Sequence, residues 1–266
     1  MCIRDRTYDA STTVSSSDLT IATGLIGSET LSLTGDVDTN SANVNTYSSS
    51  GGTINFGTTT IALADGTNGG VASNYAINNG VFTITQKVIS LSGTRLYDAT
   101  TNAVASDLTT ISGRVGAETL TLSGTGTLSD ANVAPNKAVG VGTLALGDGT
   151  GLAANYTLSG GTHQLTVNER PLNATIARQY DGTKTAAGSD LSSFDALQGG
   201  ETLFLSGSGT VANKNVANGQ GVTLGTLALD ATGATGLVSN YSLNSAALNI
   251  VQRQISTVYL LSLIHI

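Results

Sequence analysis

Short runs in which apolar and polar residues alternate recur along the whole chain, separated by segments rich in Gly, Ser, Thr, Asn and Asp. Leu120-Thr121-Leu122, Leu144-Ala145-Leu146 and Gln164-Leu165-Thr166-Val167 are examples from the middle of the sequence. Alternation with a period of two places the apolar side chains on one face of a β-strand. No segment has the apolar spacing of an amphipathic helix over a useful length, so the sequence predicts an all-β fold.

These strand-like runs belong to a unit that occurs three times in the chain. Each copy opens with a Tyr-Asp pair and continues through Ser-Asp-Leu and Glu-Thr-Leu to an Asn-Val pair. The copies begin at Tyr8, Tyr97 and Tyr180; their glutamates are Glu29, Glu118 and Glu201, and their Asn-Val asparagines are Asn43, Asn132 and Asn215. The spacing between these residues is the same in every copy, which indicates an internal structural repeat.

The length of the copies varies only after the Asn-Val pair. Copy 1 carries extra Ser and Gly residues around 47–52, which predict a lengthened surface hairpin. A second signature, an Asn-Tyr pair, then follows in each copy. These pairs are Asn74-Tyr75, Asn155-Tyr156 and Asn240-Tyr241. We expect the tyrosines of both signatures to be core residues, the second one lying at a strand corner with its hydroxyl on a backbone group.

The residue after each Tyr-Asp pair is Ala10, Ala99 or Gly182. Two alanines at one position suggest that the backbone there does not require a positive φ. We expect the preceding aspartate to close an Asx turn through its own side chain.

The repeat predicts three consecutive small domains, copy 1 at residues 7–86, copy 2 at 87–170 and copy 3 at 171–253. A β-sandwich-like fold is the first expectation for each domain, and a β-grasp-like fold is the alternative. No Pro- or Gly-rich linker separates the copies, so we expect an extended head-to-tail array. Copy 1 lacks its first strand in this interpretation, and residues 254–260 are the first strand of a truncated fourth copy. That orphan strand would fill the vacancy in copy 1 of another molecule.

The two tails have a different origin in our interpretation. A transposase end sequence, used as a DNA adapter in library preparation, would encode both tails. One of its strands encodes Met1-Cys2-Ile3-Arg4-Asp5-Arg6, and the complementary strand encodes Leu261-Ser262-Leu263-Ile264-His265-Ile266. We therefore interpret residues 1–6 and 261–266 as adapter-derived and exclude them, with Cys2 and His265, from functional reasoning. The remainder contains no cysteine, hence no disulfide framework, and we expect it to be an internal piece of a longer protein.

The composition argues against a nucleic-acid partner. Charged residues make up 11% of the chain, the net charge is −7, and the 11 Lys and Arg residues form no basic cluster. The polar surface is supplied by Ser, Thr, Asn and Gly, as is common in exported β-proteins.

Candidate chemistry is sparse. The glutamate and two aspartates per copy could suggest paired carboxylates for acid–base catalysis, but their triplication favours turn and strand-edge roles. Residues 36–40 have the opening spacing of a calcium loop, yet Ser41 and Tyr47 stand where that loop needs Gly and Glu. Gly124-Thr125-Gly126 is followed by no helix, and His163 stands alone. We therefore predict no catalytic, cofactor-binding or metal-binding residue, and no cofactor.

Three sequons could accept glycans, at Asn155, Asn173 and Asn240. The Asn74-Tyr75 pair has no sequon, so the Asn-Tyr signature is interpreted as structural, and glycosylation is left open.

Copy 3 resembles the YDG-type repeat of large bacterial surface adhesins. The residues that carry the resemblance are Arg178-Gln179-Tyr180-Asp181-Gly182-Thr183, the Glu-Thr-Leu strand, Asn215-Val216 and Asn240-Tyr241-Ser242-Leu243. The adhesins that contain this repeat resemble filamentous-haemagglutinin-like proteins exported by two-partner secretion. Copies 1 and 2 depart from the pattern, with Ala in place of the motif glycine.

The resemblance implies a secreted or surface-attached protein of a Gram-negative bacterium, in which such repeats form a stalk without catalytic residues. Its implied partners are neighbouring repeats, an outer-membrane transporter during secretion, and host or other cells through other regions. The lack of cysteine fits that route. The alternative function is that each copy is itself a binding module for a glycan or a host protein, and an enzyme is the least favoured class.

Overall fold

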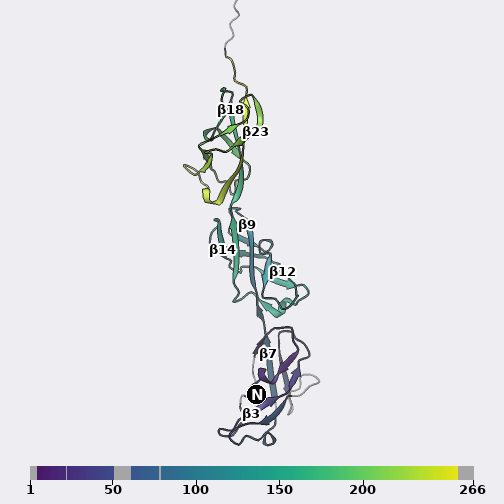
Figure 1. Cartoon of the computed structure of the whole chain (residues 1–266). Helices are drawn as coiled ribbons and strands as arrows, with labels where there is room; N and C mark the ends of the chain where they lie inside the picture. The colour runs from purple at the N-terminus through teal and green to yellow at the C-terminus, as the bar shows by residue number, and fades with distance from the viewer. Residues whose placement is uncertain (1–4, 22, 51–60, 78, 257–266) are drawn as a thin grey trace, which may run out of the picture. The chain divides into compact units, whose positions relative to one another are not determined.

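The computed structural model describes residues 5–21, 23–50, 61–77 and 79–256 (Figure 1). Within these residues the chain forms β-strands and six short 3₁₀ helices, and it contains no α-helix. The predicted all-β class is therefore confirmed. The 3₁₀ helices are η1 (Ser16–Asp18), η2 (Ala72–Asn74), η3 (Ala105–Asp107), η4 (Ala153–Asn155), η5 (Gly188–Asp190) and η6 (Val238–Asn240).

Each copy has a main sheet with the same strand order. The first strand of the copy pairs with the last strand, and the last strand pairs with the strand that follows the Asn-Val pair. In copy 1 these are β1 (Asp5–Thr7), β7 (Asn79–Thr85) and β5 (Asn45–Ser50); in copy 2, β9 (Ser90–Leu96), β17 (His163–Asn168) and β14 (Ala134–Ala138); in copy 3, β18 (Arg170–Gln179), β25 (Tyr241–Val251) and β23 (Ala217–Thr223). The three copies therefore share the order of these three strands.

Smaller strands complete each copy. β11 (Thr110–Ser112) and β20 (Leu191–Phe194) pair antiparallel with β9 and β18. The Glu-Thr-Leu strands pair antiparallel, as β3 (Leu31–Thr34) with β6 (Ala62–Asp65), β12 (Leu120–Ser123) with β15 (Ala145–Asp148), and β21 (Phe204–Ser206) with β24 (Ala228–Asp230). A further ladder joins β2 (Thr13–Ser15) to β4 (Asp36–Asp38), β10 (Asn102–Val104) to β13 (Thr125–Thr127), and β19 (Thr185–Ala187) to β22 (Ser208–Val211).

The contacts group the chain into two compact units that do not coincide with the copies. Unit 1 comprises residues 1–93, 103–127 and 138–164, and unit 2 comprises residues 94–102, 128–137 and 165–266. Each unit therefore combines one terminal copy with a part of copy 2. The division of the chain into three domains at 86 and 170 stays a prediction.

The core of copy 3 shows how the alternating pattern becomes buried surface. In β18, Leu172 and Ile176 are fully buried, and in the adjacent β25, Leu248 and Ile250 are fully buried as well. β18 and β25 run parallel, from the pair Arg170–Tyr241 to the pair Gln179–Val251. Burying one such side chain contributes roughly 1.5–3 kcal/mol, so this strand pair holds much of the stability of the copy.

Copy 1 has a short first strand, two residues of which, Asp5 and Arg6, belong to the predicted adapter tail. β1 covers three residues and pairs parallel with β7, whereas β9 and β18 cover seven and ten residues. The expectation that the whole strand is missing is corrected to this extent. The predicted long hairpin of copy 1 and the predicted orphan strand lie partly outside the described residues, as do most of the two predicted adapter tails.

The backbone after each Tyr-Asp pair contradicts the sequence-based expectation. Ala10, Ala99 and Gly182 have φ angles of 63°, 61° and 81°. The expected Asx turn is present: Asp98 Oδ1 accepts the amide hydrogen of Thr100 at 2.9 Å, and the guanidinium of Arg95 donates to Asp98 and to the Thr100 carbonyl oxygen. These hydrogen bonds hold the loop in the left-handed region, so copies 1 and 2 keep alanine there in spite of its strain.

Gly182→Ala should therefore lower the free energy of unfolding by about 0.5–1 kcal/mol, because the strain of left-handed alanine exceeds the entropy gained by removing glycine. Urea unfolding followed by circular dichroism measures this change. Gly221→Ala is the matched control, because Gly221 lies in a strand with open space around its Cβ position. A loss of stability in the control that equals that of Gly182→Ala would show that the sign of φ is not the cause.

Candidate functional site

Three residues of the repeat signature meet where copies 2 and 3 join within unit 2. Tyr97 follows β9, Glu201 lies in the turn before β21, and Tyr241 begins β25. The Tyr97 hydroxyl donates to Glu201 Oε1 at 2.7 Å, and the Tyr241 hydroxyl donates to Glu201 Oε2 at 2.6 Å. The two rings pack edge to face, with centroids 5.3 Å apart and an interplanar angle of 79°. One carboxylate of copy 3 thus binds a tyrosine from each copy.

A turn holds the glutamate and the second tyrosine in place. The Glu201 amide donates to the Gln198 carbonyl oxygen at 2.9 Å, which closes the turn, and the Gln198 amide donates to the Tyr241 hydroxyl oxygen at 3.0 Å. The expectation that the second tyrosine bonds a backbone group is therefore confirmed. Tyr97 and Tyr241 are buried, so this hydrogen-bonded group is shielded from water.

A second contact between the same copies is made by Asn240, which is 1% exposed. Its Oδ1 accepts the amide hydrogen of Val133 at 3.0 Å, and its Nδ2 donates to Asn132 Oδ1 at 3.0 Å. The Asn-Val pair of copy 2 is thus bound by the Asn-Tyr pair of copy 3. Both the oxygen and the NH₂ group of this buried side-chain amide have hydrogen-bond partners. This fixes the arrangement of the two copies at the contact, since a different arrangement would leave buried polar groups unpaired.

Unit 1 contains the same arrangement between copies 1 and 2. Tyr8 and Tyr156 donate to the two oxygens of Glu118 at 2.6 and 2.5 Å, and their ring centroids lie 5.4 Å apart. Asn155 accepts from the Val44 amide and donates to Asn43 Oδ1, both at 2.9 Å. The same five contacts therefore occur at both places where one copy meets the next.

We call each arrangement a junction and divide it into two halves. The trailing half, from the earlier copy, is the tyrosine of the Tyr-Asp pair and the Asn-Val pair. The leading half, from the later copy, is the glutamate and the Asn-Tyr pair. Five recurring side chains, namely the two tyrosines, the glutamate and the two asparagines, make the contacts of these two halves.

The environment of the junction raises the pKa of its tyrosines. Burial, followed by the hydrogen bonds to Glu118 and Glu201, raises the pKa of Tyr8 and Tyr97 to about 12. The same causes raise the pKa of Tyr156 and Tyr241. The protonated phenol is favoured because it can donate to the carboxylate, whereas a phenolate beside it would be repelled.

The chain should therefore lose stability at alkaline pH. The folded pKa lies above the unfolded value of about 10, so the stabilisation is complete below pH 10 and is lost as the pH rises through about 12. Tyrosinate absorbance and circular dichroism, recorded together against pH, should show the junction tyrosines ionising only as the fold is lost. Full ionisation of all tyrosines near pH 10 with unchanged circular dichroism would contradict this result.

The other repeated carboxylates have local roles. Asp9, Asp98 and Asp181 close the Asx turns described above. Asp18 accepts the Ser15 amide hydrogen at 3.1 Å before η1, and Asp107 does the same for Val104 at 3.3 Å before η3. The contacts agree with the turn roles expected from the triplication.

The remaining sequence candidates lie apart from the junctions. Residues 36–38 form β4, where Val37 is buried and Asp38 accepts from the Thr13 hydroxyl at 2.9 Å. His163 is buried, with Nε2 at 2.9 Å from the Leu158 carbonyl oxygen. Among the residues that the structure describes, no cluster of three or more His, Cys, Asp or Glu side chains could hold a metal ion. In the same residues no helix is long and apolar enough to cross a membrane.

The sequons differ in accessibility. The side chains of Asn155 and Asn240 are enclosed in the junctions, whereas Asn173 is exposed and bonds to Asp195. A glycan on either junction asparagine would displace the contact with the preceding copy.

One sequence expectation is wrong for the outer copies. Tyr8, Tyr97, Tyr156 and Tyr241 are buried as expected, but Tyr180 and Tyr75 are partly exposed. Tyr180 has no following copy among the described residues, and Tyr75 has no preceding one. The sequence identified the residues but not the contacts between copies, although their fixed spacing was a signal that they act together.

Comparison with known proteins gives one result. A protein-family model described as the YDG domain matches the chain twice, at residues 82–164 and 162–248, which together make up more than half of its length. No curated protein and no solved structure shows significant similarity to the chain.

Proposed function

The chain belongs to the YDG domain family, and we propose that its copies are spacer repeats in the stalk of a secreted bacterial surface adhesin. In this proposal the protein is of the filamentous-haemagglutinin-like, two-partner-secreted type, reaches the outer surface of a Gram-negative cell, and presents an adhesive region that lies elsewhere in the protein.

The observation that carries the proposal is the use of the repeated residues. A repeated binding or catalytic site would keep its shared side chains open to a ligand. Here the shared tyrosines, glutamates and asparagines of the two internal junctions bind one another across neighbouring copies. A spacer requires residues that join neighbouring copies, because a stalk transmits position and force through its junctions.

Two further features agree with an exported stalk. Residues 7–260 contain no cysteine, so the chain has no disulfide to form before or after crossing a membrane. Its polar surface is mostly uncharged, with charged residues at 11%.

The test compares the chain with versions that carry one and two additional copies, inserted after residue 170. Small-angle scattering should show the maximum dimension rising by an equal step with each copy, and glycan arrays and immobilised host matrix proteins should show no saturable binding. Binding that increases in proportion to the number of copies would contradict the spacer proposal and favour the alternative, in which each copy is a binding module.

A further inference from the structure

The first and last strands of copy 3 are neighbours and run in the same direction. β18 and β25 pair parallel along the whole of β18, from Arg170–Tyr241 to Gln179–Val251. They are the two longest strands of the described structure, with ten and eleven residues. The chain therefore enters copy 3 at one end of this strand pair and leaves it at the other.

The other two copies have the same arrangement. In copy 1, β1 and β7 pair parallel. In copy 2 the Leu91 amide donates to the Thr162 carbonyl oxygen, and the Tyr97 amide donates to the Asn168 carbonyl oxygen. Both strands advance by the same number of residues between these two hydrogen bonds, so β9 and β17 run parallel as well.

Parallel pairing decides how a copy responds when the chain is pulled. Tension on copy 3 draws β18 toward Arg170 and β25 toward Val251, which are opposite directions along the pair. The hydrogen bonds between the strands lie across this direction, so they share the load and must break together. If both strands were pulled from the same end of the pair, the bonds would break one after another.

Packing holds both strands of this pair in place. In the sheet of copy 3, β18 lies between β25 and β20, and β25 lies between β18 and β23, so neither is an edge strand. Ile176 of β18 and Leu248 and Ile250 of β25 are fully buried members of one apolar core. Sliding of one strand past the other would expose these side chains together and would leave the close-packed core disrupted.

The connection between copies 2 and 3 has no slack. β17 ends at Asn168 and β18 begins at Arg170, which leaves one residue between the last strand of one copy and the first strand of the next. The Arg170 guanidinium also donates to the Tyr97 carbonyl oxygen at 2.5 Å. Tension in the last strand of copy 2 therefore passes directly into the first strand of copy 3.

From this geometry we infer a further function of the copies, which is to bear tensile load. The parallel pair of first and last strands is a mechanical clamp that keeps a copy folded while the chain is pulled from both of its ends. In copy 3 the clamp is β18 and β25. The inference rests on strand direction and packing, and it holds whether or not the copies are adhesin spacers.

The test pulls copy 3 in two directions within the full chain. Glu169→Cys with Gln252→Cys places the attachment points at opposite ends of the clamp. Lys184→Cys with Gln252→Cys places both at the same end, and Cys2→Ser removes the single cysteine of the chain from both proteins. All three attachment residues are exposed.

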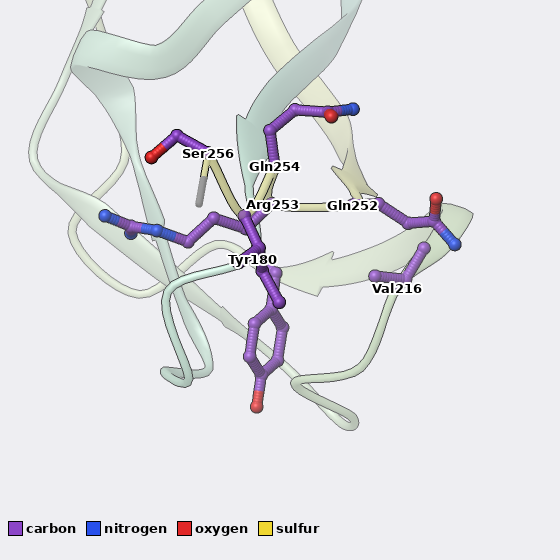
Figure 2. A pocket seen from close by; sticks show the side chains of 7 residues that line it. Tyr180, Val216, Gln252, Arg253, Gln254 and Ser256 are labelled. Atoms are coloured by element: carbon purple, nitrogen blue, oxygen red, sulfur yellow. The ribbon is translucent and has the colours of Figure 1, made fainter. Parts of the chain in front are cut away.

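Two hydrogen bonds place Lys184 and Gln252 at the same end of the clamp. The Tyr180 amide donates to the Val251 carbonyl oxygen at 2.9 Å, and the Arg178 guanidinium donates to the Thr185 carbonyl oxygen at 3.1 Å. Figure 2 shows this end of the copy, with the Gln252 side chain pointing away from Tyr180. A handle on Gln252 therefore leaves the strand pairing intact.

In single-molecule force spectroscopy at one loading rate, pulling from Glu169→Cys and Gln252→Cys should require a several-fold higher unfolding force than pulling from Lys184→Cys and Gln252→Cys. Each event should release roughly 200–300 Å of chain, the length of one unfolded copy at about 3.3–3.6 Å per residue. This length assigns the event to copy 3. Equal forces in the two directions, or a lower force along the clamp, would overturn the inference.

A matched pair of core variants separates the clamp from general stability, since forced unfolding follows the unfolding barrier and not the overall free energy. Leu248 and Leu227 belong to the same buried core, but Leu248 lies in β25 and pairs with Ile176, whereas Leu227 lies outside the clamp. Leu248→Ala and Leu227→Ala should both lower the urea midpoint. Only Leu248→Ala should lower the unfolding force along the clamp. An equal fall in force for both variants would show that resistance follows the stability of the copy, and the clamp would be the wrong account.

Discussion

Tyr241→Ala should lower the free energy of unfolding of unit 2 by about 3–5 kcal/mol, the range observed for large-to-small replacement of buried aromatic residues. Tyr241 is 3% exposed, packs edge to face on Tyr97 and donates to Glu201. Its removal leaves a cavity, an unpaired carboxylate oxygen and an unpaired Gln198 amide. The loss is a large part of the roughly 5–15 kcal/mol that stabilises a domain.

Urea unfolding of the full chain, followed by circular dichroism and by hydrogen exchange of the β18 and β25 amides, measures this loss. Tyr75→Ala is the matched control, because Tyr75 has the same place in copy 1 but is partly exposed, with no preceding copy beside it among the described residues. Its cost should be smaller by at least about 1–2 kcal/mol, since less surface is buried there. Equal losses for the two variants would show that the contact with copy 2 adds nothing.

Glu201→Ala should destabilise unit 2 by about 2–4 kcal/mol, because it removes a charged acceptor shared by two buried hydroxyl groups. Each hydrogen bond is short, at 2.7 Å from Tyr97 and 2.6 Å from Tyr241. Glu201 is the acceptor that the described structure gives for both hydroxyl hydrogens, so both O–H groups would remain buried without an acceptor.

Glu29→Ala is the corresponding control in copy 1, where the carboxylate binds one partly exposed tyrosine. Urea titration of both variants under the same conditions gives the comparison. The Glu201 variant should also lower the pKa of Tyr97, since the carboxylate is one cause of its elevation. A loss confined to the control, or an unchanged tyrosine titration in Glu201→Ala, would contradict the assigned role of this carboxylate.

The strands could be predicted from the sequence because alternation is a local property. The Leu120–Leu122 run became part of β12, with Leu120 buried and Leu122 partly buried. The Gln164–Val167 run became part of β17, with Leu165 and Val167 buried. The backbone at Ala99 could not be predicted from residue preference alone. There the side chains of Asp98 and Arg95 stabilise a conformation that alanine by itself disfavours.

The junction could be predicted only in part. The spacing identified Tyr97, Glu201 and Asn240 as residues that matter in every copy, and it placed the tyrosines in a core. It could not show that Tyr97 is buried by the following copy rather than by its own, because all copies carry the same residues. Tyr180 makes the difference visible: with the same local sequence and no following copy in the described structure, it stays partly exposed.

The central claim is that the first tyrosine of one copy and the glutamate of the next stabilise each other. A double-mutant cycle of Tyr97→Phe and Glu201→Gln tests it most directly, with Tyr180→Phe and Glu201→Gln as the reference pair. For Tyr97 and Glu201 we expect a coupling free energy of about 1–2 kcal/mol in urea unfolding, as for residues in one hydrogen-bonded network. For the reference pair we expect additivity. A Tyr97–Glu201 coupling indistinguishable from that of the reference pair would contradict the account.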